Sequence, residues 1–241
     1  MIYSCISDVG LIRDKNEDSY LAISNKYDDF LAIVADGIGG GKAGEVASSE
    51  VIKYFNDTFV ESGEFETIDN AIDYIKYHIG KVNKIVFDKA SSNSEYYGMG
   101  TTLTGILITK KGIITFNCGD SRTYGILDKK IYKLTTDHNV VNQMLEKGEI
   151  TYEESLNHPK RHYLTKAIGI FEKTKFDVFK VKEMDYYLVC SDGLHGYVSD
   201  DEIYSIVSNE DKNINEKTNE LKDLALLKGG FDNITIILIK R

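Results

Sequence analysis

Residues 31–37 read LAIVADG, a run of five apolar residues that stops at an aspartate followed by a glycine. The pattern returns in residues 114–120 (ITFNCGD) and 187–193 (YLVCSDG). It is inverted in residues 231–237 (FDNITII), where the aspartate precedes the apolar run. Short apolar runs bounded by Asp, Gly and Ser are typical of buried β-strands. These four stretches therefore predict strands whose ends carry carboxylates.

The aspartates of these runs are expected to meet at one edge of a sheet. Asp36, Asp120 and Asp192 follow their runs, whereas Asp18 and Asp232 precede theirs. In an antiparallel sheet, the end of one strand lies beside the start of its neighbour. Carboxylates without His or Cys suit Mg²⁺ or Mn²⁺ rather than Zn²⁺, and such cations would offset the repulsion between them. Taken singly, an aspartate next to glycine is also an ordinary turn signal.

The rest of the chain predicts a layered α+β domain over residues 1–241, with antiparallel pairing indicated by the short hairpin connection at 127–131. The segment 139–165 is less strand-like, holds the only proline and is a candidate flap. Strands are predicted at 2–7, 20–24, 30–35, 101–108, 113–117, 123–127, 130–134, 176–182, 186–190 and 234–240. Helices are predicted at 44–59, 68–90, 200–208 and 214–227.

Composition limits the class of protein. The 241 residues are 42% hydrophobic and 28% charged, which is typical of a globular domain. A net charge of -9 without a block of basic residues argues against nucleic acid or an anionic membrane as partner. Three cysteines cannot pair evenly, and no signal peptide or apolar membrane span is evident, so a reducing, cytoplasmic location is expected.

Other kinds of catalytic or binding site are less well supported. Gly39, Gly41 and Gly44 satisfy the G-x-G-x-x-G spacing of a dinucleotide-binding loop, but Asp36 would point a carboxylate at the pyrophosphate and the strand–helix alternation of such folds is missing. No cysteine is followed six residues later by arginine, as a cysteine phosphatase needs, and no G-x-S-x-G elbow occurs. The five histidines show no zinc-ligand spacing.

Eight segments, in order, resemble the metal-dependent type 2C Ser/Thr protein phosphatases (PPM family) in their single-domain bacterial form. They are residues 10–19 (GLIRDKNEDS), 34–48 (VADGIGGGKAGEVAS), 100–105 (GTTLTG), 117–125 (NCGDSRTYG), 134–139 (LTTDHN), 161–169 (RHYLTKAIG), 188–194 (LVCSDGL) and 229–237 (GGFDNITII). The resemblance implies a four-layer αββα sandwich, with two central antiparallel sheets flanked by helix pairs and a metal site in a cleft at one edge.

The resemblance also implies roles for individual residues, which are carried over position by position. Asp36 would bridge two Mn²⁺ or Mg²⁺ ions, with the Gly37 carbonyl on the first ion and Asp192 and Asp232 on the second. The remaining positions are Asp120, linked with Asp192 to a third, weaker metal; Glu17 and Asp18, which act near the metals through bound water; Arg13, which grips the substrate phosphate; and Asn233, which orients the neighbouring carboxylate.

The mechanism implied by the resemblance is direct attack on phosphorus by a hydroxide held between two cations about 3.5 to 4 Å apart, without a phosphoenzyme. Two histidines of relatives are missing, because Gly41 and Ile38 stand in their places. The candidates for the proton donor are therefore a metal-bound water and the residues His138 and His162.

The resemblance predicts a monomeric phosphatase that acts on phosphoserine and phosphothreonine in proteins and opposes a bacterial Ser/Thr kinase. A second hypothesis is a catalytically silent member of the same fold that binds phosphoproteins, although its intact ligand positions count against this. The dinucleotide-binding enzyme is the third.

Overall fold

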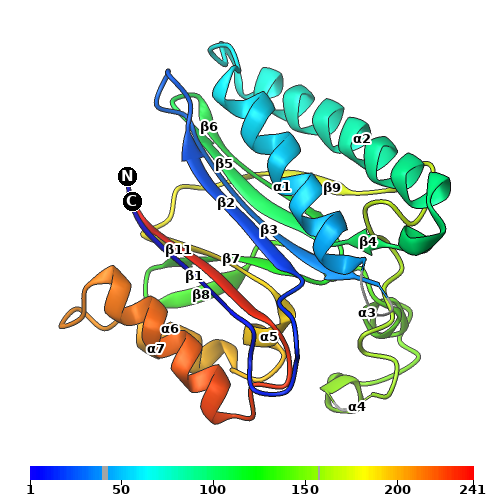
Figure 1. Cartoon of the computed structure of the whole chain (residues 1–241). Coiled ribbons are helices and arrows are strands. Elements are labelled where there is room, and N and C mark those ends of the chain that lie inside the picture. The colour runs from blue at the N-terminus through cyan, green and yellow to red at the C-terminus, as the bar shows by residue number, and fades with distance from the viewer. Residues whose placement is uncertain (40–42, 157) are drawn as a thin grey trace.

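Two antiparallel β-sheets pack face to face at the centre of the molecule (Figure 1). The computed structural model describes residues 1–39, 43–156 and 158–241. One sheet consists, in order, of β1 (Ile2–Asp8), β11 (Ile234–Lys240), β10 (Tyr186–Cys190), β7 (Arg122–Leu127) and β8 (Lys130–Lys133). The other consists of β2 (Asp18–Ser24), β3 (Phe30–Ile38), β5 (Leu103–Thr109), β6 (Gly112–Cys118) and β9 (Asp177–Val181), with β4 (Gly100–Thr101) paired to β3.

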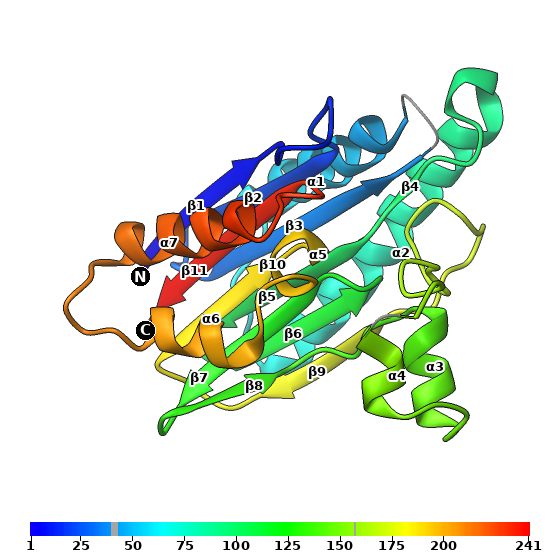
Figure 2. The same cartoon turned by 90° about the horizontal axis from the view of Figure 1, so that it is seen from below.

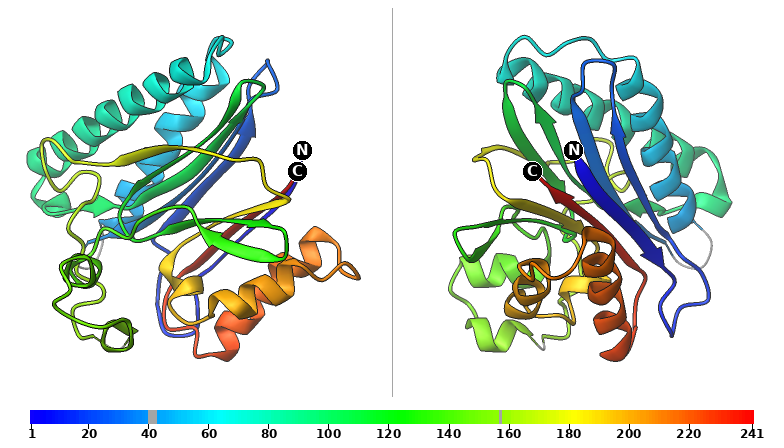
Figure 3. Two further views of the ribbon diagram at one scale, coloured as in Figure 1. Left: turned by 180° about the vertical axis from the view of Figure 1, so that it is seen from behind. Right: turned by 90° about the vertical axis from the view of Figure 1, so that its left-hand side faces the viewer.

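Helix pairs cover the outer faces of both sheets, which confirms the predicted αββα sandwich (Figures 1 and 3). The long helices are α1 (Gly44–Val60) and α2 (Ile68–Ser92) on the second sheet, and α6 (Asp200–Val207) and α7 (Ile214–Leu227) on the first. The shorter ones are η1 (Ser94–Tyr96), α3 (Val140–Glu146), α4 (Tyr152–Leu156) and α5 (Asp192–His195). Among the described residues, none of the helices combines the length and the apolar character needed to cross a membrane.

The alternation of side chains along β3 explains why the sheets stack. Phe30, Ala32 and Val34 face the other sheet and join the core between the two sheets. Leu31 and Ile33 point the opposite way, into the core beneath α1 and α2. Successive residues of a strand face opposite sides, so a run that is apolar at every position is a strand buried on both faces. The uninterrupted apolar run at residues 30–35 thus encodes a central layer.

The predicted strands and long helices agree with the structure to within a few residues, with one exception. The strand predicted at 101–108 is divided at Thr102 into β4 and β5. The Thr102 N–H donates to the Asp36 carbonyl (2.8 Å), and the Thr102 hydroxyl accepts from the Asp36 N–H (2.9 Å). This side-chain contact interrupts the ladder at Thr102, while the chain pairs with β3 on both sides of it, through β4 and β5.

The predicted hairpin at 127–131 is present as the turn between β7 and β8. Its two central residues, Asp128 and Lys129, have φ values of 50° and 59°. Two consecutive residues with positive φ match the twist of the flanking strands. The turn therefore fixes the antiparallel register of this sheet edge.

The segment 139–165 lies beside the sandwich and contains α3 and α4 (Figure 2). Its ends are tied together, because the Val140 N–H donates to the Tyr163 carbonyl (2.9 Å) and the Thr165 N–H donates to the His138 carbonyl (2.8 Å). It remains a predicted flap.

Candidate active site

Four of the five strand-end aspartates line one cavity. Asp36 lies near the end of β3, Asp120 follows β6, Asp192 begins α5 directly after β10, and Asp232 lies just before β11. The cavity has a volume of about 320 Å³. Its other walls include Arg13, Glu17, Gly37, Thr102, His162, Tyr197, Phe231 and Asn233. The convergence expected from antiparallel strand ends is therefore present for these four carboxylates.

Asp36 is held by its backbone and leaves its carboxylate to the cavity. Besides the two bonds to Thr102, its carbonyl accepts from the Thr101 hydroxyl (2.9 Å). None of the hydrogen bonds formed by the described residues ends on its carboxylate. Burial, and then the charges of Asp18 and Asp192, raise the pKa of the Asp36 carboxyl well above its ordinary value. A nearby positive charge would stabilise the ionised form of this carboxyl group.

Asp18 lies behind the cavity rather than on its wall. It is the β2 residue directly opposite Asp36 on β3, and it is buried. One of its oxygens accepts from the Ser191 hydroxyl (2.7 Å), whereas Oδ1 is buried without a partner among the described residues. Burial raises the pKa of Asp18 to about 7, even though the Ser191 hydroxyl favours the ionised form. Asp18 thus places a second carboxyl group next to Asp36, away from the cavity wall.

Two aspartates have positively charged or hydrogen-donating partners from the chain itself. The Arg13 Nη2 lies 2.7 Å from Asp232 Oδ2, and its Nε donates to the Phe231 carbonyl (3.4 Å). His162 Nδ1 lies 3.4 Å from Asp192 Oδ2. Burial opposes ionisation of Asp192, but its contact with His162 and the charges around it hold its pKa below the ordinary value.

The oxygen-rich wall fits hard divalent cations. Asp36, Asp120 and Glu17 all have a raised pKa, in each case chiefly through burial, so the described protein groups do not compensate their charge. Carboxylate and carbonyl oxygens are the ligands that Mg²⁺ and Mn²⁺ prefer. Within residues 1–39, 43–156 and 158–241, no three His, Cys, Asp or Glu side chains are gathered as closely as in a completed metal site. The carboxylates line the same cavity, but Arg13 contacts Asp232 and His162 contacts Asp192.

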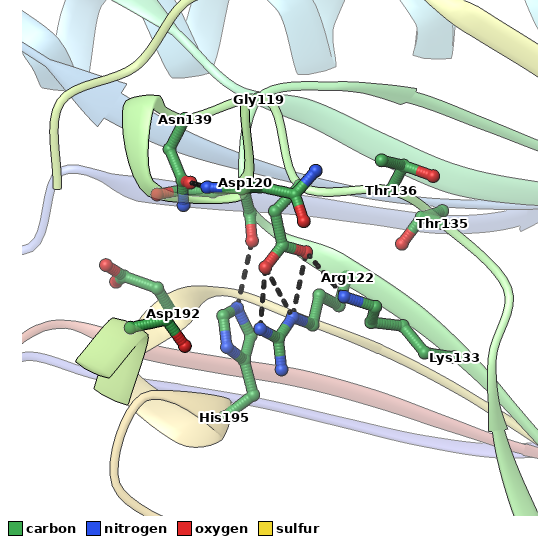
Figure 4. Close-up of polar contacts among 12 residues, drawn as sticks. Gly119, Asp120, Arg122, Lys133, Thr135, Thr136, Asn139, Asp192 and His195 are labelled. Carbon is green, nitrogen blue, oxygen red and sulfur yellow. Dashed lines mark hydrogen bonds and ion pairs between the residues drawn. The ribbon is translucent and has the colours of Figure 1, made fainter. Parts of the chain in front are cut away.

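The Asp120 loop is braced by polar side chains, of which Asp137 is buried and His195 and Arg122 are partly buried (Figure 4). His195 Nε2 lies 3.0 Å from the Asp120 carbonyl, which can only accept, so Nε2 carries the proton. Burial lowers the pKa of His195 to about 3, which keeps the ring neutral near pH 7. Beside it, the Arg122 guanidinium grips both oxygens of Asp137, at 2.9 Å from Nε and 2.6 Å from Nη2. This brace connects the Asp120 loop to the helix that begins at Asp192.

Of the two histidines considered as proton donors, only His162 lines the cavity. His138 is buried, and its Nε2 donates to Asp177 Oδ2 (2.8 Å). Its Nδ1 accepts from the Gly119 N–H (3.2 Å), so both ring nitrogens are used within the protein. His138 therefore secures the backbone before Asp120 instead of facing the cavity.

Asn233 connects the N-terminal and C-terminal segments of the site. Its Nδ2 donates to the Val9 and Lys15 carbonyls (both 2.9 Å), and its Oδ1 accepts from the Glu17 N–H (2.8 Å). The loop that carries Arg13 and Glu17 is thus fastened to the residue after Asp232. The sequence indicated Asn233 but gave no direct signal for His195, Tyr197 or Phe231, whose places depend on tertiary packing.

The G-x-G-x-x-G spacing does not occur in the fold that a dinucleotide-binding loop requires. Gly39 directly follows β3 and Gly44 begins α1, whereas Gly41 is outside the described residues. Both sheets are antiparallel, not the parallel doubly wound sheet that binds dinucleotides at its strand ends.

Comparisons with known proteins agree with this geometry. The family model described as protein phosphatase 2C matches residues 13–224. The serine/threonine phosphatase stp of Listeria welshimeri is 35% identical over 237 residues, which cover 98% of this chain and 94% of the relative. Protein phosphatase PhpP of Streptococcus pneumoniae is 32% identical over 241 residues, covering 99% and 97%. The crystal structure of serine/threonine phosphatase Stp1 from Staphylococcus aureus superimposes with a TM-score of 0.94 at 36% identity, covering 99% of this chain and 94% of that one.

Proposed function

The chain belongs to the protein phosphatase 2C family and is a protein serine/threonine phosphatase, and we propose that it works through divalent cations held by Asp36, Asp192 and Asp232. The observation that carries this proposal is that these carboxylates line one cavity together with the Arg13 guanidinium. The family is metal-dependent. For this chain we propose two Mn²⁺ or Mg²⁺ ions and a third, weaker one.

The residues of the cavity are assigned as follows. Asp36 and the Gly37 carbonyl would hold one ion, Asp192 and Asp232 with Asp36 the second, and Asp120 with Asp192 the third. Glu17, on the wall, and Asp18, behind it, would act through water. Bound cations would lower the pKa of a water so that it can attack phosphorus as hydroxide. They would also place positive charge opposite the phosphoryl oxygens.

The chain's own groups position the substrate. The Arg13 side chain is about half exposed, and among the described residues its Nη1 makes no hydrogen bond, so this end of the planar fork is available to phosphate oxygens. Thr102 fixes Asp36 through the backbone, which keeps the carboxylate directed at the cavity without using its oxygens. Among the described residues His162 is the histidine on the wall, and it is assigned the proton for the departing serine or threonine oxygen through Nδ1, since its Nε2 accepts from Arg161 Nε (2.8 Å).

The substrates proposed are phosphoserine and phosphothreonine proteins, including a cognate kinase that the phosphatase opposes. We propose that the protein acts as a monomer in the cytoplasm. The three cysteines support a reducing compartment, since all are free and burial raises the pKa of the Cys5 thiol to about 11 and that of Cys118 to about 12.

The test is release of phosphate from a phosphothreonine peptide. Activity should require added Mn²⁺ or Mg²⁺, should stop in excess EDTA and should be lost in Asp36→Asn. Asp73→Asn, on the exposed face of α2, is the matched control and should keep full activity. Turnover that persists in EDTA would contradict the metal mechanism, and metal-dependent peptide binding without turnover would support the silent member of the family.

A further inference from the structure

Three large apolar side chains next to Arg13 and Asp232 in the sequence are exposed to solvent, and one of them, Phe231, lines the cavity. Leu11 and Ile12, directly before Arg13, are 66% and 63% exposed. Phe231, directly before Asp232, is 50% exposed. We refer to Leu11, Ile12 and Phe231 as the apolar rim. Exposed apolar groups gathered in one place mark binding surfaces more often than isolated ones do.

The backbone that carries the rim is fixed. The Leu11 N–H donates to the Gly230 carbonyl (2.7 Å), so the two loops are joined to each other. Gly10 and Gly230 have φ values of +80° and +50°, which other residues rarely adopt. A Cβ at Gly10 would also lie only 2.4 Å from the Asp232 carbonyl oxygen. The side chains are therefore presented by a closely packed backbone.

The rim is continuous with the phosphate site. The Arg13 Nε donates to the Phe231 carbonyl, and the same guanidinium pairs with Asp232. The Phe231 ring lies 5.4 Å from the ring of Tyr197, centroid to centroid, and both rings line the cavity that contains the carboxylates. The Phe231 ring thus lies at the cavity, and the loop that carries Leu11 and Ile12 is joined to the Phe231 loop by the Leu11–Gly230 hydrogen bond.

We propose that the apolar rim binds an apolar side chain next to the phosphorylated serine or threonine of the substrate protein. The proposal rests on the phosphatase function and names a preferred substrate class for it. Consecutive residues of an extended peptide are about 3.3 Å apart, so a neighbour of the phosphorylated residue reaches Phe231 or the Leu11–Ile12 pair once the phosphate lies against Arg13. A pair of exposed aliphatic residues with an aromatic ring suits leucine, isoleucine or methionine.

Charge favours a substrate over the other possible occupants of this surface. The chain has a net charge of -9 and no block of basic residues, so an anionic membrane would repel it. A second copy of the chain would carry the same charge, and self-association of the rim would have to overcome that repulsion. A phosphorylated peptide is anionic as well, but Arg13 and the proposed cations beside the rim would hold its phosphate.

The test compares phosphothreonine peptides that differ only in the residues beside phosphothreonine. One set has leucine on the N-terminal or the C-terminal side, and the other has asparagine, which is similar in shape but polar. In Mn²⁺, the wild type should turn over a leucine peptide with a kcat/KM about 10-fold higher, mainly through KM. In Leu11→Asn/Ile12→Asn this preference should fall to about 2-fold or less. The control Val60→Asn, at an exposed site at the end of α1, should keep it.

The possible failures can be told apart. Equal kcat/KM for leucine and asparagine peptides on both flanks in the wild type would overturn the rim proposal while leaving the phosphatase intact. A preference that survives in the double variant would also overturn it. Light scattering that shows a wild-type dimer and a monomeric double variant would assign the rim to self-association instead. A wild type with no metal-dependent turnover of either peptide would overturn the phosphatase function itself, and the rim proposal with it.

Discussion

The His195 Nε2–H donates a hydrogen bond to the main-chain carbonyl of Asp120, with 3.0 Å between nitrogen and oxygen (Figure 4). The bond joins two segments that are distant in sequence, the loop after β6 and the short helix α5 that begins at Asp192. It fixes the positions of two carboxylates without using their oxygens. Since the partly buried ring is neutral near pH 7, the bond adds no charge to an already acidic cavity.

Replacing this histidine should loosen the Asp120 loop. In His195→Ala the buried carbonyl would lose its donor, which typically costs about 1 to 3 kcal/mol of unfolding free energy. Urea unfolding should show this loss, and a higher Mn²⁺ concentration should be needed for half-maximal binding in calorimetry. His195→Gln can donate from its amide and should recover part of both effects. Full stability in His195→Ala would show that the bond contributes little.

Replacing Asn233 should lower activity about as much as replacing a residue that orients a metal ligand. In Asn233→Ala the loop that carries Glu17 would lose two donors and one acceptor, and the loss of groups that orient ligands typically lowers activity about 10- to 100-fold. The fall should appear in kcat/KM for a phosphothreonine peptide. Asn219→Ala, on the exposed side of α7, should have no such effect. An unchanged kcat/KM would contradict the positioning role.

Arg13 should have opposing effects on substrate and metal. Charge-assisted hydrogen bonds contribute about 1.5 to 3 kcal/mol, so Arg13→Ala should raise the peptide KM about 10- to 100-fold. The same change frees Asp232 Oδ2 from its ion pair, so the Mn²⁺ dissociation constant should fall. Arg13→Lys keeps the charge but lacks the fork, and should recover KM only in part. A lower peptide KM or weaker Mn²⁺ binding in Arg13→Ala would contradict these roles of Arg13.

The Arg122–Asp137 pair should matter for stability. Asp137 is buried, and Arg122 also donates to the Tyr124 hydroxyl (2.8 Å). Removing one partner of a buried ion pair typically costs about 3 to 5 kcal/mol. Asp137→Asn should therefore unfold at a clearly lower urea concentration, whereas Arg122→Met/Asp137→Leu should recover much of the loss. Equal stability of Asp137→Asn and wild type would show that solvent compensates the charge.

Glu202 should contribute stability that disappears in acid. Its Oε2 accepts from Lys228 Nζ (2.6 Å) and from the Ser199 N–H (2.9 Å), and these contacts lower its pKa from 4.5 to about 2. A carboxyl with a depressed pKa stabilises the fold above its unfolded pKa and loses that contribution as pH falls towards the folded value. Because Glu202 is exposed, we expect only about 1 kcal/mol at pH 7.

Urea unfolding of wild type and Glu202→Gln at several pH values tests this directly. The difference between the two proteins should be largest at pH 7 and shrink between about pH 4.5 and 2. Glu66→Gln, at another exposed position, is the control. A difference that stays constant with pH would mean that Glu202 acts through its shape and not through its charge.

Much of the fold was predictable from the sequence because its patterns are local. The run at 30–35 encodes a strand buried on both faces, and α2 shows apolar residues at helical spacing, which its buried Ile75 and Ile79 confirm. The meeting of Asp36 with Asp192 was predictable as well, since strand ends of antiparallel sheets share an edge. In these cases the spacing along the chain determines the position in space.

Other features depend on contacts between distant segments. His138 looked like a flap residue near the site, but its ring is turned to Asp177, 39 residues later in the chain. Phe231 reaches the cavity because its loop is tied to Leu11, more than 200 residues earlier. Neither relationship leaves a periodic signal in the sequence. Asp18, expected among the others, is the direct partner of Asp36 across β2 and β3, but it is buried and does not line the cavity.

The position of β11 bears on when a growing chain can become active. β11 lies between β1 and β10, and Asp232 stands two residues before it. Since the ribosome builds proteins from the N-terminus, Asp232 and Asn233 are the last of the site residues to be made. A nascent chain that already displays Asp36 and Asp192 still lacks the strand that holds the first sheet together. We therefore expect unfinished chains to lack phosphatase activity. Dephosphorylation would then begin only after the whole domain has been synthesised and has folded.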